Sequence, residues 1–454
     1  MAVATAAQVH GESPPKDIRI FNSTELLSQR VRKWQPPAIS SLLPLEAVPG
    51  MISLIVGKPN PDCFPFSSIS IGLKGTNEQL ILNETDLHDA FQYALLPGGI
   101  PELRQWFEEF QARIHGPGPV GTWGCAIGSG SQDLLYKAFQ VFTDPGDYVL
   151  IDTPAYSGTL GFLSADCHNL VEVLSDAEGL NPTELEIVLS QWPDHKRRPR
   201  ILYTVPTGSN PTGRSCTQAR KIEILRLAKK FNFLIFEDDA YYFLDFADPA
   251  VKARSYVSLE AEVNGETGRV LRFDSLSKIV SAGMRLGFLT TSPSILQKVN
   301  MITGNTNLQA ASTSQVIALA LLRHWGHEGF LTHTSNAAEF YRHKRDMLVA
   351  AAERYLQDKA TWEVPTAGMF LWIKLLLPPG RDSFEVLTSF SSAAGVIAVP
   401  GMAFMPSRSK TCQLRLSFSL VTEDEANEAC RRIATLVESA FTEAAKGNHT
   451  WSDE

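Results

Sequence analysis

The chain has 454 residues, 44% of them hydrophobic and 20% charged, which is the ordinary composition of a globular protein with two or three domains. A formal net charge of −8 without a long basic cluster disfavours nucleic acid as a partner. No apolar run has transmembrane length, no signal-peptide pattern is present, and six scattered cysteines without C-x-x-C spacing favour a cytoplasmic location.

In chain order, residues 1–60 are interrupted by prolines and are expected to form an N-terminal arm. From about residue 85 to residue 300, apolar runs alternate with amphipathic stretches, which predicts an α/β domain over residues 61–310 with a mostly parallel sheet covered by helices. The predicted strands are Tyr148–Asp152, Leu170–Leu174, Ile201–Val205, Phe231–Glu237, Arg269–Phe273 and Leu286–Thr290. The predicted helices are Pro101–His115, Gln132–Phe142, Asn181–Gln191 and Thr217–Lys230.

Residues 311–454 are expected to hold linking helices and a smaller α+β domain. A long helix is predicted over Ser314–Tyr355 and a C-terminal helix over Glu423–Ala444. The predicted strands between them are Thr361–Val364, Met369–Leu375, Val396–Pro400 and Gln413–Ser419.

Four chemically distinct side chains follow successive strands of the larger domain. Asn210 follows the strand Ile201–Val205, Asp238 and Tyr241 follow Phe231–Glu237, and Lys278 follows Arg269–Phe273. Ligands of parallel sheets bind beyond the carboxyl ends of the strands, where these residues are expected to meet. An amide, a carboxylate, a phenol and an amine together are what pyridoxal phosphate requires.

Each residue type answers one need of that cofactor. Lys278 can attach an aldehyde covalently and later act as a base. Asp238 can keep a pyridine nitrogen protonated, while Tyr241 and Asn210 can donate to the phenolate oxygen of the ring.

A phosphate group needs hydroxyls, the N–H groups of a helix N-terminus and a cation. Ser131 and Gln132 open a predicted helix, while Ser275, Ser277 and Arg285 surround Lys278 in the sequence. Arginine suits a phosphate because its guanidinium donates a planar fork of hydrogen bonds.

Taken singly, these pieces have ordinary explanations. The Ser-x-Ser-Lys segment could be a solvated loop, Asp238 a helix cap, and the Pro-Thr-Gly after Asn210 a turn. Arg415, on an alternating strand, could be a surface arginine, and Tyr156 could pack in the core. With an amino-acid cofactor, Arg415 instead suits a substrate carboxylate and Tyr156 a stack on the ring.

These motifs resemble the fold-type I pyridoxal-phosphate aminotransferases, in particular the kynurenine/2-aminoadipate and fungal-type aromatic group. The similarity spans roughly residues 50–440 and includes Gly99-Ile100-Pro101-Glu102-Leu103, Ser129-Gly130-Ser131-Gln132, Pro154-Ala155-Tyr156-Ser157-Gly158, Glu237-Asp238-Asp239 and Ala367-Gly368-Met369-Phe370-Leu371-Trp372.

The resemblance implies that Lys278 carries the cofactor, Asp238 pairs with its ring nitrogen, Tyr156 stacks on the ring, and Asn210 and Tyr241 bond its oxygen. It implies that the phosphate is held by Ser131, Gln132, Ser275, Ser277 and Arg285. It also implies an obligate homodimer, in which Tyr93 reaches the phosphate of the neighbouring subunit. The substrate carboxylate is expected at Arg415 and Asn210, with Gly57 lining the pocket. No metal is implied.

Three departures from the family pattern bear on the substrate. Val56-Gly57-Lys58 stands where the family has Gly-Gly-Leu, Ile39 is followed by serine rather than by an arginine, and Ala240 replaces a proline. Without that arginine in the arm, amino acids with a second carboxylate are disfavoured as substrates. The expected amino donors are therefore aromatic amino acids (tryptophan, phenylalanine, tyrosine or kynurenine). A 2-oxo acid such as 2-oxoglutarate is the expected acceptor.

Two other reactions stay open, namely transamination of 2-aminoadipate, if Lys58 replaces the arm arginine, and β-elimination with C–S cleavage in a specialised pathway. A non-catalytic regulator is disfavoured, because the first 50 residues are too short and too neutral for a DNA-binding module.

Overall fold

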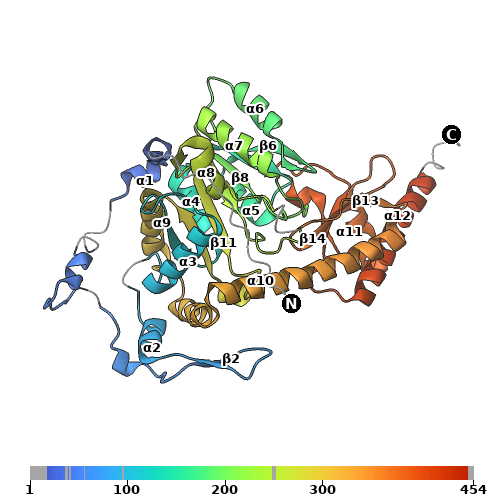
Figure 1. Ribbon diagram of the computed structural model, residues 1–454. Helices are drawn as coiled ribbons and strands as arrows, with labels where there is room; N and C mark the ends of the chain where they lie inside the picture. The colour runs from blue at the N-terminus through green and yellow to red at the C-terminus, as the bar shows by residue number, and fades with distance from the viewer. Residues whose placement is uncertain are drawn as a thin grey trace, which may run out of the picture.

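A computed structural model describes residues 18–35, 39, 42–55, 57–94, 97–247 and 252–447. A large eight-stranded sheet lies at its centre, and a four-stranded sheet lies toward the C-terminus (Figure 1). Helix α10, Ser312–Leu356, is broken at Gly326, where the backbone is not helical, and its second part runs to the small sheet and joins the two parts. The first 17 residues of the expected arm lie outside the described residues.

The large sheet has the strand order β4-β12-β11-β9-β8-β5-β6-β7. Strands β11, β9, β8, β5 and β6 run parallel, whereas β12 is antiparallel to β11 and β4. The bounds are β4 Gly124–Gly128, β5 Tyr148–Thr153, β6 Asn169–Asp176, β7 Gly179–Leu180, β8 Ile201–Thr204, β9 Leu234–Asp238, β11 Val270–Ser275 and β12 Gly287–Thr291. The mostly parallel sheet predicted from the sequence is therefore confirmed.

The sequence prediction erred at three places in this sheet, one of which is the two-residue edge strand β7, which was not predicted. The strand predicted from Phe231 begins only at Leu234, because helix α7 extends to Phe231 and ends at Asn232 in a left-handed conformation. Strand β4 was not predicted, since its five residues include two glycines and an alanine and lack the β-branched run that marks a buried strand.

Helices cover both faces of the large sheet because its buried strands are apolar on both sides. Phe236 of β9 packs in the cluster formed with α3, α4, α5 and α9, whereas its neighbour Ile235 packs with α6, α7 and α8. The helix bounds are α3 Pro101–Ile114, α4 Ser131–Phe142, α5 Ser157–Ala165, α6 Pro182–Ser190, α7 Gln218–Phe231, α8 Tyr256–Asn264 and α9 Pro293–Thr306. Among the described residues, no helix is both long and apolar enough to cross a membrane.

The small sheet is antiparallel throughout, with the order β13-β14-β16-β15. Its elements are β13 Ala360–Trp362, β14 Phe370–Leu375, α11 Ser383–Ala394, β15 Val399–Pro400, β16 Gln413–Ser417 and α12 Glu423–Gly447. Alternate residues of β14, such as Leu371 and Ile373, enter a separate apolar core with α10 and α12. The predicted α+β domain is thus confirmed.

The described part of the arm contacts the body mainly through its first residues, where Leu26 and Val31 are buried in the main core and Arg200 donates to the Leu26 carbonyl at 2.7 Å. Strand β1, Arg19–Ile20, pairs with β10, Glu266–Thr267, and α1, Gln29–Lys33, packs against α4. Farther along lie the hairpin β2–β3, Ser70–Gly72 and Gln79–Ile81, and helix α2, Glu84–Phe91, which packs on α10 (Figure 1). Large apolar side chains of the arm stay exposed, with Ile52 at 86% and Leu54 at 93%.

A buried ion cluster ties strands β9 and β11 together at their carboxyl ends. The Arg272 guanidinium, fully buried, donates to Asp239 at 2.7 Å and to Asp274 at 2.8 Å, and lies 3.2 Å from Glu237. Burial and repulsion by Asp239 raise the pKa of Asp274, while Arg272 acts in the opposite direction. The arginine is therefore the cation that allows these carboxylates to be buried.

Replacing Arg272 with methionine would leave three buried carboxylates without their cation. We expect the free energy of unfolding to fall by about 3–5 kcal/mol, measured by equilibrium urea denaturation. The matched control is Arg342→Met, which removes an exposed ion pair with Glu339 and should leave the midpoint near that of the wild type. Equal midpoints for the two variants would contradict this role of Arg272.

Candidate active site

The polar residues predicted from the sequence gather at the carboxyl ends of β5, β8, β9 and β11. Tyr156 follows β5, Asn210 follows β8, Asp238 ends β9, and Lys278 follows β11. Lys278 and Tyr156 both lie within electrostatic range of Asp238 and Arg415. The parallel strands thus bring together residues that are far apart in the sequence.

Asp238 is buried with one carboxylate oxygen free. Its Oδ2 accepts a hydrogen bond of 2.8 Å from the Tyr203 hydroxyl, and its Oδ1 has no partner among the described residues. Burial raises the pKa of Asp238 to about 7; Tyr203 and Lys278 lower it, while Asp239 and Asp274 raise it further. A buried oxygen without a donor favours a cationic N–H group beside it.

Lys278 has the environment of a reactive amine. Partial burial lowers its pKa, Arg285 and Arg415 lower it further, and Asp238 opposes them. A larger fraction of its amine is therefore neutral, the form that attacks a carbonyl carbon.

An anion site lies at the N-terminus of α4. Its N-cap is Gly130, which has φ of +93° and no side chain, so the first N–H groups of the helix lack a side-chain cap. A β-carbon at Gly130 would lie 2.5 Å from Nη2 of Arg285, so only glycine lets this guanidinium approach. Arg285 Nη1 donates to Ser277 Oγ at 2.9 Å. The helix N-terminus, a cation and a hydroxyl thus converge.

Two neighbouring side chains support this site. The Ser275 hydroxyl accepts from the backbone N–H of Ser277 at 3.2 Å. Gln132, predicted as a phosphate ligand, donates its side-chain amide to the carbonyl of Gly158 at 3.1 Å. Its side chain therefore ties the first turn of α5, which follows Tyr156, to α4.

Arg415 enters the cluster from strand β16 of the small domain. Its Nη1 donates to Asn210 Oδ1 at 2.7 Å, and its guanidinium lies 4.3 Å from the ring centre of Phe370 and 4.9 Å from that of Phe404. Partial burial lowers the pKa of Arg415, and its Nε has no partner in the described structure. The two aromatic rings fix a cation whose remaining donors suit a carboxylate.

Two predicted site residues are not brought into this cluster by the single chain. Gly57 has no heavy atom within 4 Å of its would-be β-carbon, and Tyr93 is 50% exposed. Both lie on the arm side of the molecule, where Gln92 donates to the Pro59 carbonyl at 3.0 Å.

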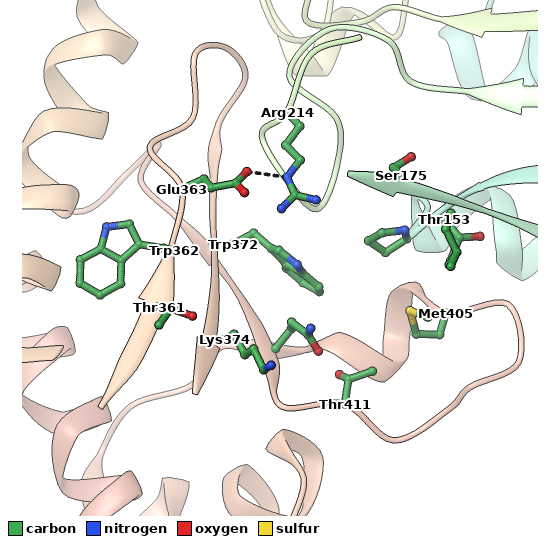
Figure 2. A pocket seen from close by; sticks show the side chains of 13 residues that line it. Thr153, Ser175, Arg214, Thr361, Trp362, Glu363, Trp372, Lys374, Met405 and Thr411 are labelled. Carbon is green, nitrogen blue, oxygen red and sulfur yellow. Dashed lines mark hydrogen bonds and ion pairs between the residues drawn. The ribbon is translucent and has the colours of Figure 1, made fainter. Parts of the chain in front are cut away.

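A cavity of about 420 Å³ lies beside the cluster, between the two domains (Figure 2). Thr153 of the large domain and Trp372 and Lys374 of β14 line it. Arg214 reaches across to Glu363, and its Nε donates to Oε2 at 2.7 Å. Lys278 and Asp238 do not line this cavity, so it is a gap between domains next to the site.

Tyr203, Phe370 and Phe404 contact site residues but were not predicted as functional. Tyr203 lies within a predicted strand, where the sequence pattern indicates only that its ring packs in the core. Phe404 is distant in sequence from Arg415, and no local pattern joins them. Only the register of β8 on β9 could have placed the hydroxyl beside Asp238.

A profile of aminotransferase class I and II matches residues 124–433. The chain belongs to this family. It is 58% identical over 422 residues to aminotransferase tdiD of Emericella nidulans, covering 92% of this chain and 97% of the relative. It is 39% identical to the mitochondrial kynurenine/alpha-aminoadipate aminotransferase of Mus musculus, covering 93% and 99%. The crystal structure of the aromatic aminotransferase Aro9 from Candida albicans superposes with a TM-score of 0.81 at 26% identity, covering 93% and 99%.

This aminotransferase uses pyridoxal 5′-phosphate, and its residues fit that group. The free Oδ1 of Asp238 suits a protonated ring nitrogen, and the uncapped N-terminus of α4 with Arg285 suits a phosphate. The amine of Lys278 is partly buried, and the charges of Arg285 and Asp238 both act on its pKa.

The anion site can be tested by comparing pyridoxal phosphate with pyridoxal. In Arg285→Met, affinity for the phosphorylated form should fall about ten- to a hundred-fold, while affinity for pyridoxal changes little, because one charge-assisted contact is lost. Titration of the cofactor-free enzyme followed by absorbance measures both affinities. Arg220→Met, which removes an arginine paired with Asp176 elsewhere in the domain, is the control. Equal losses for both forms would contradict a phosphate contact.

Proposed function

We propose that this aminotransferase transfers the amino group of an aromatic amino acid, of the tryptophan, phenylalanine, tyrosine or kynurenine type, to a 2-oxo acid such as 2-oxoglutarate. The observation that carries the proposal is the Arg415–Asn210 pair beside Lys278 and Asp238. The names of the relatives, which include an aromatic and a kynurenine/alpha-aminoadipate aminotransferase, support it.

In this proposal each residue has one task. When bound, the cofactor supplies an aldehyde that takes up the amino group and a ring that withdraws electrons from the Cα–H bond. Arg415 and Asn210 hold the substrate carboxylate, which fixes the direction of that bond. The Lys278 amine carries the proton from Cα to the cofactor, and Asp238 stabilises the positive charge of the ring nitrogen. Tyr156 packs on the ring and Tyr241 donates to its oxygen.

The remaining donors complete the proposed cofactor site. Arg285, Ser275, Ser277 and the first turn of α4 at Ser131 hold the phosphate. Gln132 contributes through its backbone in that turn, because its side chain is bonded to Gly158.

The arm supports aromatic rather than acidic side chains as substrates. Lys58, the residue that could replace the missing arginine, lies 3.9 Å from Glu46, whose carboxylate also accepts from the Ser53 hydroxyl. Its charge is therefore already paired, which weakens it as a partner for the second carboxylate of 2-aminoadipate. Gly57 beside it leaves room at the proposed pocket.

Replacing Arg415 should damage catalysis through the substrate carboxylate. In Arg415→Met we expect kcat/KM for tryptophan to fall at least about a hundred-fold, and Arg415→Lys should recover little of it, because an ammonium lacks the planar fork. Oxo-acid formation from a panel of aromatic, acidic and sulfur-containing amino acids measures this and identifies the donor. Arg408→Met, an exposed arginine of the same domain, is the control.

Three outcomes of that panel would redirect the assignment. Preference for 2-aminoadipate would replace the substrate class, and release of ammonia and a thiol without amino transfer would indicate elimination. Full activity of Arg415→Met would contradict the carboxylate site.

The proposed active unit is a homodimer in which Tyr93 reaches the phosphate of the other subunit. The exposed apolar side chains of the arm and the separation of Tyr93 from the cluster support it.

We also propose that the chain divides into an arm (residues 1–60), a large domain (residues 61–310) and a small domain (residues 311–454). A cytoplasmic location is proposed on the six free thiols.

Shared sites predict complementation between two inactive subunits. Lys278→Ala and Tyr93→Ala homodimers should each have little activity, but subunit exchange should restore up to about a quarter of wild-type activity, since half of the dimers are hybrids with one intact site. Activity after mixing, with light scattering for the mass, measures this. Lys278→Ala mixed with Arg285→Met should give no such recovery if both residues belong to one subunit's site. Absence of recovery in the first mixture, despite exchange, would contradict the shared site.

A further inference from the structure

The two oxygens of the Asp238 carboxylate have different surroundings. Oδ2 accepts the Tyr203 hydroxyl at 2.8 Å, whereas Oδ1 has no partner in the described part of the chain. Tyr203 is fully buried and Asp238 is 6% exposed, so water does not compete for either oxygen. One oxygen is therefore used by the protein and the other is left available.

The register of the sheet fixes this contact. Tyr203 on β8 is opposite Phe236 on β9, and Asp238 lies two residues farther along the same face of β9. The hydroxyl thus reaches diagonally between adjacent strands, a spacing that a long aromatic side chain spans. The Tyr203 ring packs in the core near Phe139 and Phe236. A side chain locked in the core holds its hydroxyl in one place.

A carboxylate that accepts one fixed hydrogen bond can no longer turn about its Cβ–Cγ bond without losing it. Among the charges that act on Asp238, Asp239 and Asp274 repel it and Lys278 attracts it, but none of the three makes a hydrogen bond that would fix the direction of its two oxygens. Tyr203 is the one side-chain donor to Asp238 among the described residues. Orientation of the carboxylate thus depends on the phenol.

We propose that Tyr203 is a positioning residue for the cofactor, whose hydroxyl turns Asp238 so that Oδ1 faces the ring N–H of pyridoxal phosphate. The inference rests on the proposed pairing of Asp238 with the ring nitrogen. Tyr203 contributes no atom to the cofactor itself and acts through the carboxylate alone.

The test is Tyr203→Phe, which keeps the packed ring and removes only the hydroxyl. The cofactor is removed from the full-length enzyme, and either pyridoxal phosphate or an analogue with carbon in place of the ring nitrogen is titrated back. Wild-type enzyme should prefer pyridoxal phosphate, because only it offers an N–H to Oδ1. In Tyr203→Phe, binding of pyridoxal phosphate should weaken about ten- to a hundred-fold, as for loss of a hydrogen bond to a charged group, while binding of the analogue changes little.

The control variant is Tyr256→Phe, which removes the hydroxyl of another fully buried tyrosine, bonded to the Cys216 sulfur away from the site. It should leave both affinities unchanged. A purely structural role for Tyr203 predicts equal weakening of both ligands, and this result would overturn the inference. Equal affinity of wild-type enzyme for both ligands would instead overturn the proposed pairing of Asp238, and the inference with it.

Discussion

The neutralisation of three carboxylates by Arg272 is the constraint on which the site depends. Strand β9 ends in Glu237 and Asp238, Asp239 follows directly, and successive side chains of an extended chain point to opposite faces. Glu237 and Asp239 therefore turn toward Arg272, while Asp238 turns toward Tyr203 and Lys278. Without the buried cation, an acidic tripeptide at this depth would repel itself and destabilise the strand end.

Because of this alternation, the carboxylates that stabilise the fold lie on one face of the strand and the carboxylate of the site lies on the other. On one face, the carboxylates are matched by a guanidinium and serve the fold. On the other, Asp238 keeps an unpaired oxygen and a pKa raised to about 7, which is costly for an empty site and favourable for a bound cation. The same five-residue strand thus anchors the sheet and prepares the site.

The sequence predicted the site better than it predicted the contacts within it. Lys278, Asp238 and Asn210 could be found because each follows an apolar run, and strand ends of a parallel sheet meet at one edge. Strand β4 was not predicted because glycine and alanine carry no strand signal, and the bond from the Gln132 side-chain amide to the Gly158 carbonyl was not foreseen. The Tyr203 contact required the register between β8 and β9, and the Phe404 contact required the packing of the turn Gly401–Phe404 against β16 within the small domain, which local patterns do not contain.

The substrate side of the site exists only while the domains are in contact. Arg415 belongs to β16 of the small domain, and its partner Asn210 belongs to the loop after β8 of the large one. Four residues beyond Asn210, Arg214 makes a second contact between domains through Glu363 on the chain after β13. Because both contacts involve one loop of the large domain, a shift of the small domain moves the arginine and the amide relative to each other. A carboxylate bound between them would bridge the domains and favour the arrangement in which both of its ligands are in place. Substrate binding and the relative position of the domains are therefore coupled through contacts that include this loop.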